Sequence, residues 1–493
     1  MTTDTDAPSA DIGVPAESRF RRFVPSSSLR PHLVLAVLFL VVFTTISVLR
    51  YTHYAAMSWD NSIFVQEVRQ YAHLHAPIVT IKGVDYNILG DHFSPIIALL
   101  APFYLVFPST VTLLVGQAAL FAWSVGIVSR TVEQVLGDGE RGARAKGLAV
   151  GVAYGLSFGL QRAADVGFHE IAFGVPLLAM VLRNLVLKRW YPAAYWALPL
   201  VLVKEDMGLT VAMVGVVMLL QRQWKPGVLL TVFGPLMFLI TINLVIPHFN
   251  IHGHYDYDSN LPGGSIAQTL FDKPLDTLHS LVNPVVKLHT TGYLLAITGF
   301  MALRSPYVLL VIPTLFWRYT GSVEFYWGLD WHYSAVLMPI LFLATVDGIQ
   351  RADSGRVEWL RSYATKAVIP VVTAISVTLC VVWALPITNA TDPSALNSAD
   401  RVAMLKRAAA TIPNGATVEA NITLMDHLAT RTELYWVGSG PARPAQYFAL
   451  DLSYGWSDPP SDVASYAQQQ YPNATYKVIF NEGQFQVAQL VSG

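Results

Sequence analysis

Four short polar stretches of the sequence bring carboxylates, histidines and cations next to long apolar runs. The first stretch contains Asp60, in WDNSIF, and closes with Asp91 and His92, in GDHFSP. The other three are QRAADVGFHE, VKEDMG and LDWHY, and they contribute Arg162, Asp165, His169, Glu170, Lys204, Glu205, Asp206, Asp330, His332 and Tyr333. Ionisable side chains at membrane depth are costly and tend to face a cavity or one another, which makes these residues candidates for function.

Asp60 is the strongest candidate for chemistry among them. It lies in a half-buried amphipathic stretch, and no neighbouring Lys or Arg offers it a local ion pair. A carboxylate within reach of a substrate hydroxyl can accept its proton as a general base. The other stretches also have structural interpretations, as a helix cap at 91–92, a helix N-terminus at 169–170 and a charged turn at 204–206.

The composition is that of a polytopic membrane protein. Of the 493 residues 53% are hydrophobic and only 13% are charged, which is about half the charge of a typical soluble enzyme. The net charge of −1 and the absence of a Lys/Arg block argue against a nucleic-acid partner. Cys380 is the only cysteine, so there is neither a disulfide framework nor a thiolate metal site.

Apolar runs recur along the chain and predict an all-α bundle of about eleven transmembrane helices. Several runs are shorter than the roughly 20 residues that a perpendicular helix needs, which leaves room for broken or re-entrant helices. The run 94–107, which contains Pro95, predicts an interfacial helix instead of a span. The predicted spans lie near 33–49, 110–129, 147–161, 168–187, 190–203, 207–221, 226–246, 286–303, 305–319, 333–349 and 366–387.

The distribution of Lys and Arg orients this bundle. With the N-terminus inside, more than half of the 32 Lys and Arg residues fall in the tail and the inner loops, as the positive-inside rule expects. An odd number of spans then leaves the C-terminal part outside, together with the four polar stretches. We expect a disordered cytoplasmic tail at 1–32, a transmembrane domain at 33–387 with its first outer loop at 50–109, and an extracytoplasmic domain at 388–493.

The C-terminal part changes character and predicts a small α/β domain. ADRVAMLKRAAATI has the pattern of a helix, and a Pro-Asn-Gly turn follows it. ATVEANI, TELYWVG, AQYFALDL and YKVIFNEGQFQVAQL have the patterns of strands.

The order of long motifs closely resembles an uncharacterised bacterial family of integral-membrane proteins, from residue 33 onward. The motifs are WDNSIFVQEV, NILGDHFSPIIALLAPFYLVFPS, FHEIAF, KEDMGL, WHYSAVLMP and IPNGATVEANITLMDHLATRTELYWV. That family in turn resembles the GT-C superfamily, which comprises polytopic glycosyltransferases that take a sugar from a polyprenyl-phosphate carrier on the outer face of the membrane.

The resemblance to the GT-C superfamily implies a catalytic carboxylate in the first outer loop, and Asp60 holds that position. It also implies a proline-containing interfacial helix like HFSPIIALLAPFYLVFPS, and an Arg with an acidic residue in a later loop, like QRAADVGFHE. One departure is that Asn61 follows Asp60 where many relatives carry an acidic pair. Asp91 is the candidate for the second carboxylate, from the far end of the same loop.

Such an enzyme would act in a bacterial plasma membrane on a polyprenyl-phosphate-linked sugar, with an envelope glycan, lipid or protein as acceptor. Asp60 would take the acceptor proton, and the sugar configuration would invert because no covalent sugar–enzyme step is needed. Arg162, Lys204 and His332 would stabilise the departing phosphate. The side chains also permit a divalent cation, either Mg²⁺, Mn²⁺ or Ca²⁺ on oxygen ligands or Zn²⁺ on His92 and His169, although no ligand spacing requires one.

Two other functions fit the same residues. In a transporter of a small polar substrate or an envelope precursor, the charged turns would line the pathway. Against this, the ionisable residues gather at one face instead of near the midplane of broken helices. In a non-catalytic scaffold, residues 388–493 would bind an envelope partner.

Overall fold

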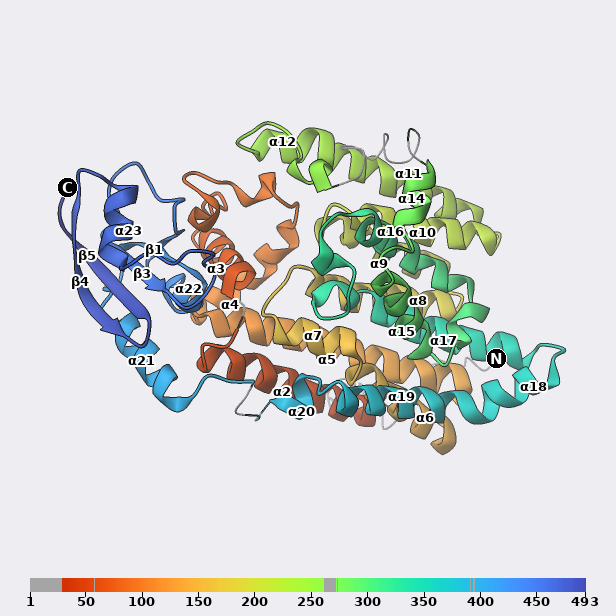
Figure 1. Ribbon diagram of the computed structural model, residues 1–493. Helices are drawn as coiled ribbons and strands as arrows, with labels where there is room; N and C mark the ends of the chain where they lie inside the picture. The colour runs from red at the N-terminus through yellow and green to blue at the C-terminus, as the bar shows by residue number, and fades with distance from the viewer. Residues whose placement is uncertain (1–28, 57, 261–271, 273, 391, 393–394) are drawn as a thin grey trace, which may run out of the picture.

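The computed structural model describes residues 29–493 except 57, 261–271, 273, 391 and 393–394. Nearly all of the expected tail 1–32 lies outside the described residues. The described chain forms a mostly helical body with a small sheet domain near the C-terminus (Figure 1).

Five helices of the described chain are long and apolar enough to cross a membrane. The central one, His332–Asp353, is 94% buried over its apolar window, whereas the windows of Trp224–Phe249 and Glu358–Val382 are only 22% buried. Large apolar side chains are exposed on the outer helices, for example Val34 and Val37, as contact with lipid requires. The five are α2 (Arg30–Thr52), α5 (Thr110–Gly137), α11 to α12 (Trp224–Phe249), α17 with its preceding 3₁₀ turn (His332–Asp353) and α18 to α19 (Glu358–Val382).

The remaining bundle helices are shorter, so the expected number of eleven spans is not confirmed. Prolines explain where some of them break: Pro199 is the second residue of the 3₁₀ turn Leu198–Leu202 inside the expected span 190–203, and Pro306 begins another, Pro306–Val311. The shorter helices are α6 (Arg141–Gly155), α7 (Phe158–Asp165), α8 (Ile171–Val186), α9 (Trp190–Ala197), α10 (Met207–Leu220), α14 (Pro274–Ser280), α15 (Val286–Ala296) and α16 (Ile312–Thr320).

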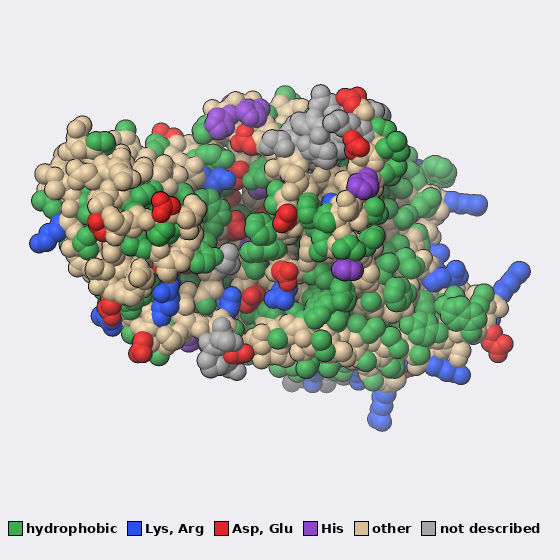
Figure 2. All heavy atoms as spheres, in the orientation of Figure 1, with side chains coloured by type: hydrophobic (Ala, Val, Ile, Leu, Met, Phe, Trp, Pro, Cys, Tyr) green, Lys and Arg blue, Asp and Glu red, His purple; other side chains and the backbone are tan. Residues whose placement is uncertain are grey.

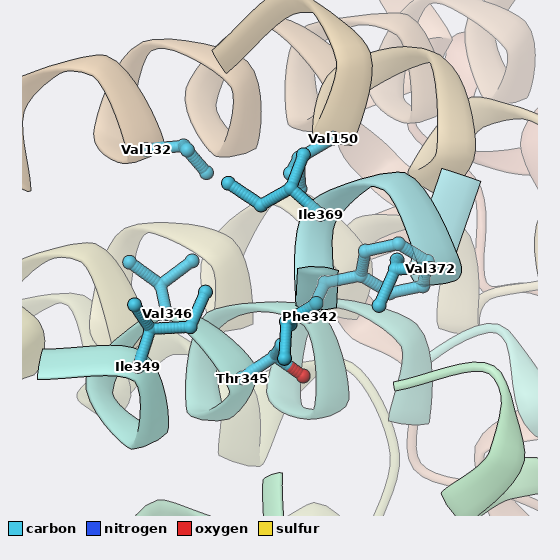
Figure 3. A pocket seen from close by; sticks show the side chains of 9 residues that line it. Val132, Val150, Phe342, Thr345, Val346, Ile349, Ile369 and Val372 are labelled. Atoms are coloured by element: carbon cyan, nitrogen blue, oxygen red, sulfur yellow. The ribbon is translucent and has the colours of Figure 1, made fainter. Parts of the chain in front are cut away.

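Small residues let the bundle helices approach closely. A Cβ added at Gly147 of α6 would lie 2.6 Å from the carbonyl oxygen of Ser129 on α5, so only glycine fits there. Where α5, α6, α17 and α19 meet, aliphatic side chains leave a cavity of about 10 Å³ around Phe342 and Ile369 (Figure 3). A cavity this small and apolar is a packing gap and offers no ligand site.

The segment between α2 and α5 forms the platform at the end of the bundle where the C-terminal domain lies (Figure 1). It contains α3 (Ser58–Ala72), and its last part is the 3₁₀ helix Pro95–Leu100 followed by α4 (Ala101–Val106). One face of this last part is buried through Ile97 and Tyr104, and the other exposes Phe103 and Val106. The expected amphipathic helix is therefore present, and its contact with a membrane stays a prediction.

The C-terminal domain has the predicted strands and helix. Its sheet has the order β2-β1-β3-β5-β4, in which β2, β1 and β3 are parallel and β5 runs antiparallel to β3 and β4. Leu434 and Phe485 join the apolar core of the bundle, while Phe448 and Val463 form a separate core. The elements are α21 (Ala399–Ala410), β1 (Thr417–Ala420), α22 (Met425–Leu428), β2 (Glu433–Trp436), β3 (Tyr447–Asp451), α23 (Val463–Gln470), β4 (Thr475–Glu482) and β5 (Phe485–Ser492).

Candidate active site

Asp60 and His169 meet at the end of the bundle that faces the C-terminal domain. Asp60 is in the first turn of α3, and its Oδ2 lies 3.3 Å from Nε2 of His169. The Asp60 side chain is 52% exposed, whereas that of His169 is 5% exposed. Crowding by neighbouring atoms opposes ionisation of Asp60, but the bond to His169 and the charges of His169 and Lys204 outweigh it and hold the pKa of Asp60 below its usual range. Asp60 is thus an ionised, accessible carboxylate.

His169 is fixed from several sides. Its backbone N–H donates to Oε1 of Gln117 at 3.1 Å, and its ring lies against that of His332 with the centroids 3.7 Å apart. The His332 ring in turn contacts Tyr333, and Nδ1 of His332 is buried without a hydrogen-bond partner.

A buried ion pair lies behind this histidine pair. Nζ of Lys204 is 2.9 Å from Oε1 of Glu170, and the two side chains are 16% and 4% exposed. Although burial penalises the charge of Lys204, the Glu170 carboxylate favours its ionised form, so the pKa of Lys204 is raised. Asp206, at the start of α10, has no such partner, and burial raises its pKa to about 6 despite the nearby Lys204.

Glu205 joins the predicted charged turn to the first outer loop. Its Oε1 is 2.7 Å from Nδ1 of His92, and its Oε2 accepts from the backbone N–H of Phe93 at 3.2 Å. The hydroxyl of Tyr255 also donates to Glu205, at 3.1 Å. Burial opposes the charge on Glu205, but His92 and Lys204 lower its pKa to about 2.

Asp91 is occupied by partners of its own. Its Oδ2 is 3.1 Å from Nζ of Lys82, and its Oδ1 accepts from the hydroxyl of Tyr257 at 3.1 Å. The Asp91 side chain is only 9% exposed. The structure therefore brings Asp91 and His92 to the same end of the bundle as Asp60, but in a closed network of hydrogen bonds.

Arg162 and Asp165 form a second group. They are in the last turns of helix α7, which corrects the expectation that they lie in a turn. Arg162 Nη2 is 3.5 Å from Oδ1 of Asp330, and Asp165 pairs with Arg50 at 3.2 Å. Arg50, Arg162 and Asp165 line a cavity of about 220 Å³ beside Pro386. The Arg162 group is connected to the Asp60 group along the chain, because Asp330, which pairs with Arg162, precedes His332 by two residues.

Charged side chains gather in a hollow between the C-terminal domain and the bundle, as Figure 2 shows. Residues 50–488 match the model of a protein family described as predicted membrane protein, DUF2079. The chain belongs to the DUF2079 family. This confirms the resemblance to an uncharacterised family of membrane proteins.

No protein in the curated set matches this DUF2079 chain. Among solved structures, ArnT from Cupriavidus metallidurans, crystallised bound to undecaprenyl phosphate, is similar over 92% of this chain and 97% of its own. The TM-score is 0.51 and the sequence identity is 11%. At this identity the comparison shows the fold alone, and the chain has an ArnT-like fold.

Sequence reasoning missed several residues of this end of the DUF2079 chain. Lys82, Tyr255 and Tyr257 complete the Asp91 and Glu205 networks, and the alternation of aromatic and polar residues in HGHYDYD was the available signal. Arg318 lies in the expected span 305–319, is fully buried and donates to the carbonyls of Tyr326 and Gly328 at 2.7 Å. A charge within an expected span should have drawn attention to it.

The described part of the site contains no cluster of ligands for a divalent cation. Within the described ranges, no three His, Cys, Asp or Glu side chains are grouped so that they could hold a metal ion. Asp91, His92 and His169 are each engaged by another partner, and Asn61, next to Asp60, donates no negative charge.

Proposed function

We propose that this DUF2079 protein is a membrane glycosyltransferase that moves a sugar from a polyprenyl-phosphate carrier to an acceptor hydroxyl on the outer face of a bacterial plasma membrane. The observation that carries the proposal is the accessible, ionised Asp60, held by His169 at one end of a GT-C-like fold. The undecaprenyl phosphate bound to ArnT supports a carrier lipid of this class.

Asp60 acts as the general base in this proposal. The acceptor oxygen attacks the anomeric carbon as its proton passes to Asp60, and the bond from that carbon to the phosphate oxygen breaks. The electron pair leaves with the lipid phosphate, so the products are the glycosylated acceptor and the free polyprenyl phosphate. Attack opposite the leaving group inverts the anomeric configuration.

Positively charged side chains assist both the general base and the leaving phosphate. His169 orients the Asp60 carboxylate, and the nearby Lys204 keeps it ionised before the acceptor arrives. Arg50 and Arg162 line the cavity beside α7 with Asp165, while Asp330, the other partner of Arg162, is not among the residues that line it. We assign the lipid phosphate to this cavity, because fixed cations in a poorly solvated site stabilise a developing anion more strongly than water does.

The remaining candidate residues shape the site. Glu170, Glu205, Asp91 and His92 hold the loops around Asp60 through the pairs described above. The Tyr333 ring is partly exposed, and we assign it to packing against a sugar ring, whereas the buried His332 ring supports it from the side of His169. Burial raises the pKa of Asp206, beside Lys204, to about 6, and we assign Asp206 to acceptor binding, where its carboxylate accepts a hydrogen bond from an acceptor hydroxyl.

The test uses purified protein in liposomes with lipid-linked sugars extracted from bacterial membranes, and measures the free undecaprenyl phosphate that is released. We expect Asp60→Asn to lower the rate by roughly 10²–10⁴-fold, which is the usual contribution of a general base. Asp138→Asn is the matched control. Asp138 directly follows the C-terminus of α5, at the end of the bundle away from Asp60, so the rate should stay unchanged.

An unchanged rate in correctly inserted Asp60→Asn would remove the assignment of Asp60. If the wild-type protein releases no undecaprenyl phosphate but passes a solute across liposomes that lack any lipid donor, the protein is a transporter. If substitutions on the exposed face of residues 388–493 abolish only binding to an envelope partner, it is a scaffold.

A further inference from the structure

The C-terminal domain packs directly on α3, the helix that carries Asp60. Leu428 and Leu434 belong to the same buried apolar core as Ile63 and Val65 of α3. Trp59, next to Asp60, makes an edge-to-face contact with Trp436 at 4.8 Å between ring centroids. The domain therefore shares its inner core with the candidate site and is not a detached module.

Polar contacts fix the register of this packing. Nε2 of Gln66 and the hydroxyl of Thr80 donate to the carbonyl oxygen of Leu434, at 3.0 and 2.6 Å. Nη1 of Arg69 donates to the carbonyl oxygen of Thr432 at 3.1 Å. Since these bonds go to backbone carbonyls, they position α3 whatever the side chains of the sheet are.

Asp426 reaches the two residues that follow Asp60. The Asp426 side chain is buried, and its Oδ1 accepts from the hydroxyl of Ser62 at 2.9 Å. The amide of Asn61 lies close enough to favour the ionised form of Asp426, although burial still raises the pKa of Asp426 to about 7. Oδ1 of Asn61 accepts from the backbone N–H of Phe168 at 3.2 Å. Asn61 and Ser62 thus connect the C-terminal domain to the loop that carries His169.

His427 holds the chain on the other side of Asp60. Its ring is stacked on those of Tyr51 and Tyr54, with centroids 4.3 and 3.8 Å away. Its Nε2 lies 3.2 Å from the carbonyl oxygen of Tyr51. Asp426 and His427, which are adjacent in α22, therefore contact the chain after and before Asp60, respectively.

We propose that Asp426 and His427 form a clamp on the start of α3, and that Asp426 is a positioning residue for Asp60. The meaning of the clamp rests on the proposed role of Asp60. Asp426 does not touch the reacting atoms. It fixes Asn61 and Ser62, so that the Asp60 carboxylate stays beside His169 with one side open to the hollow.

The chain offers a direct test, because its only cysteine is the buried Cys380. In Asp60→Cys, the rate at which N-ethylmaleimide labels residue 60 reports how freely the start of α3 moves. Labelling of Cys380 in the same sample, followed by peptide mass spectrometry, reports global loosening. The assay needs no substrate, so its outcome is separate from that of the transferase test.

Adding Asp426→Ala to Asp60→Cys should raise the labelling rate at residue 60 by roughly two- to tenfold, the factor expected for one lost buried hydrogen bond, and leave Cys380 unlabelled. Ser62→Ala, which removes only the facing hydroxyl, should do the same and keeps the test valid if Asp426→Ala does not fold. Asp426→Asn retains an acceptor for Ser62 and should stay near the parent rate. Glu482→Ala, in an exposed ion pair of the same domain, is the control.

Two results would overturn the clamp. The first is an unchanged labelling rate at residue 60 in both Asp426→Ala and Ser62→Ala. The second is labelling of Cys380 that rises in step with residue 60, which would mean that Asp426 supports the fold as a whole and has no specific role in holding α3.

Discussion

The two ends of the helical bundle use buried charge in opposite ways. At the end away from the C-terminal domain, Glu133 of α5 is fully buried and contacts His32, Arg130 at 3.1 Å and Arg144 at 3.4 Å. At the other end, Asp60 pairs with His169 and its side chain is 52% exposed. A carboxylate enclosed by three bases is suited to holding helices together, whereas one held from a single side can still receive a proton. The number of basic partners around a carboxylate therefore distinguishes a structural carboxylate from a chemically active one better than burial of a charge does.

The largest effect on stability is expected from breaking the enclosed network. Glu133→Ala leaves His32, Arg130 and Arg144 without their shared partner, and we expect it to lower the free energy of unfolding by roughly 3–5 kcal/mol. Asp60→Ala should change that energy little, because the side chain is half-exposed. Thermal unfolding of the detergent-solubilised protein compares the two. Equal losses of unfolding free energy in Glu133→Ala and Asp60→Ala would contradict the distinction between the two ends of the bundle.

The Glu205 network should give the next largest effect, through pH. The folded-state pKa of about 2 lies below the usual 4.5, so Glu205 stabilises the fold above pH 4.5 and this share is lost as the pH falls through 2. The full share is roughly 3 kcal/mol for a shift of this size. In a plot of the unfolding midpoint against pH, Glu205→Gln should reduce the slope on the acid side. A variant curve parallel to that of the wild type would show that another group causes the acid sensitivity.

Asp426 should have the opposite dependence, and its effect within the range from pH 6 to 8 is the smallest of the three. Its folded-state pKa of about 7 lies above the usual 3.8, so the fold loses stability as the pH rises from 3.8 through 7. Between pH 6 and 8 the loss is roughly 1 kcal/mol. Asp426→Asn should remove this slope and be the more stable form at pH 8. A slope that persists in Asp426→Asn would assign it to a different group.

Much of the fold could be predicted because apolar runs and strand patterns are local signals. The strands of the C-terminal domain and the helix 399–410 lie where the sequence places them. The helix breaks at Pro199 and Pro306 were harder to place, because a proline can begin a helix as readily as end one. The membrane orientation depends on charge counts alone and stays a prediction.

The candidate site was predictable in its residue types but not in its pairings. Sequence alone brought Asp60, His169, Lys204 and His332 to one face, and the structure adds that His169 is the partner of Asp60. It also separates Arg162 and Asp165 from that pair. Such pairings depend on contacts between residues more than 100 positions apart, as with Asp60 and His169, and no local pattern encodes them.

The Asp426 contact shows the same limit. Asp426 and Ser62 are 364 positions apart, and each looks ordinary in its own segment. Only the folded chain reveals that a residue of the C-terminal domain lies behind the proposed base.

The most direct test of the central claim is a structure of the protein in lipid nanodiscs with undecaprenyl phosphate. We expect the phosphate in the cavity lined by Arg50 and Arg162, with the hollow beside Asp60 open to an acceptor. A phosphate bound at the Glu133 end of the bundle, or a polar tunnel through the bundle with no lipid beside Asp60, would contradict it.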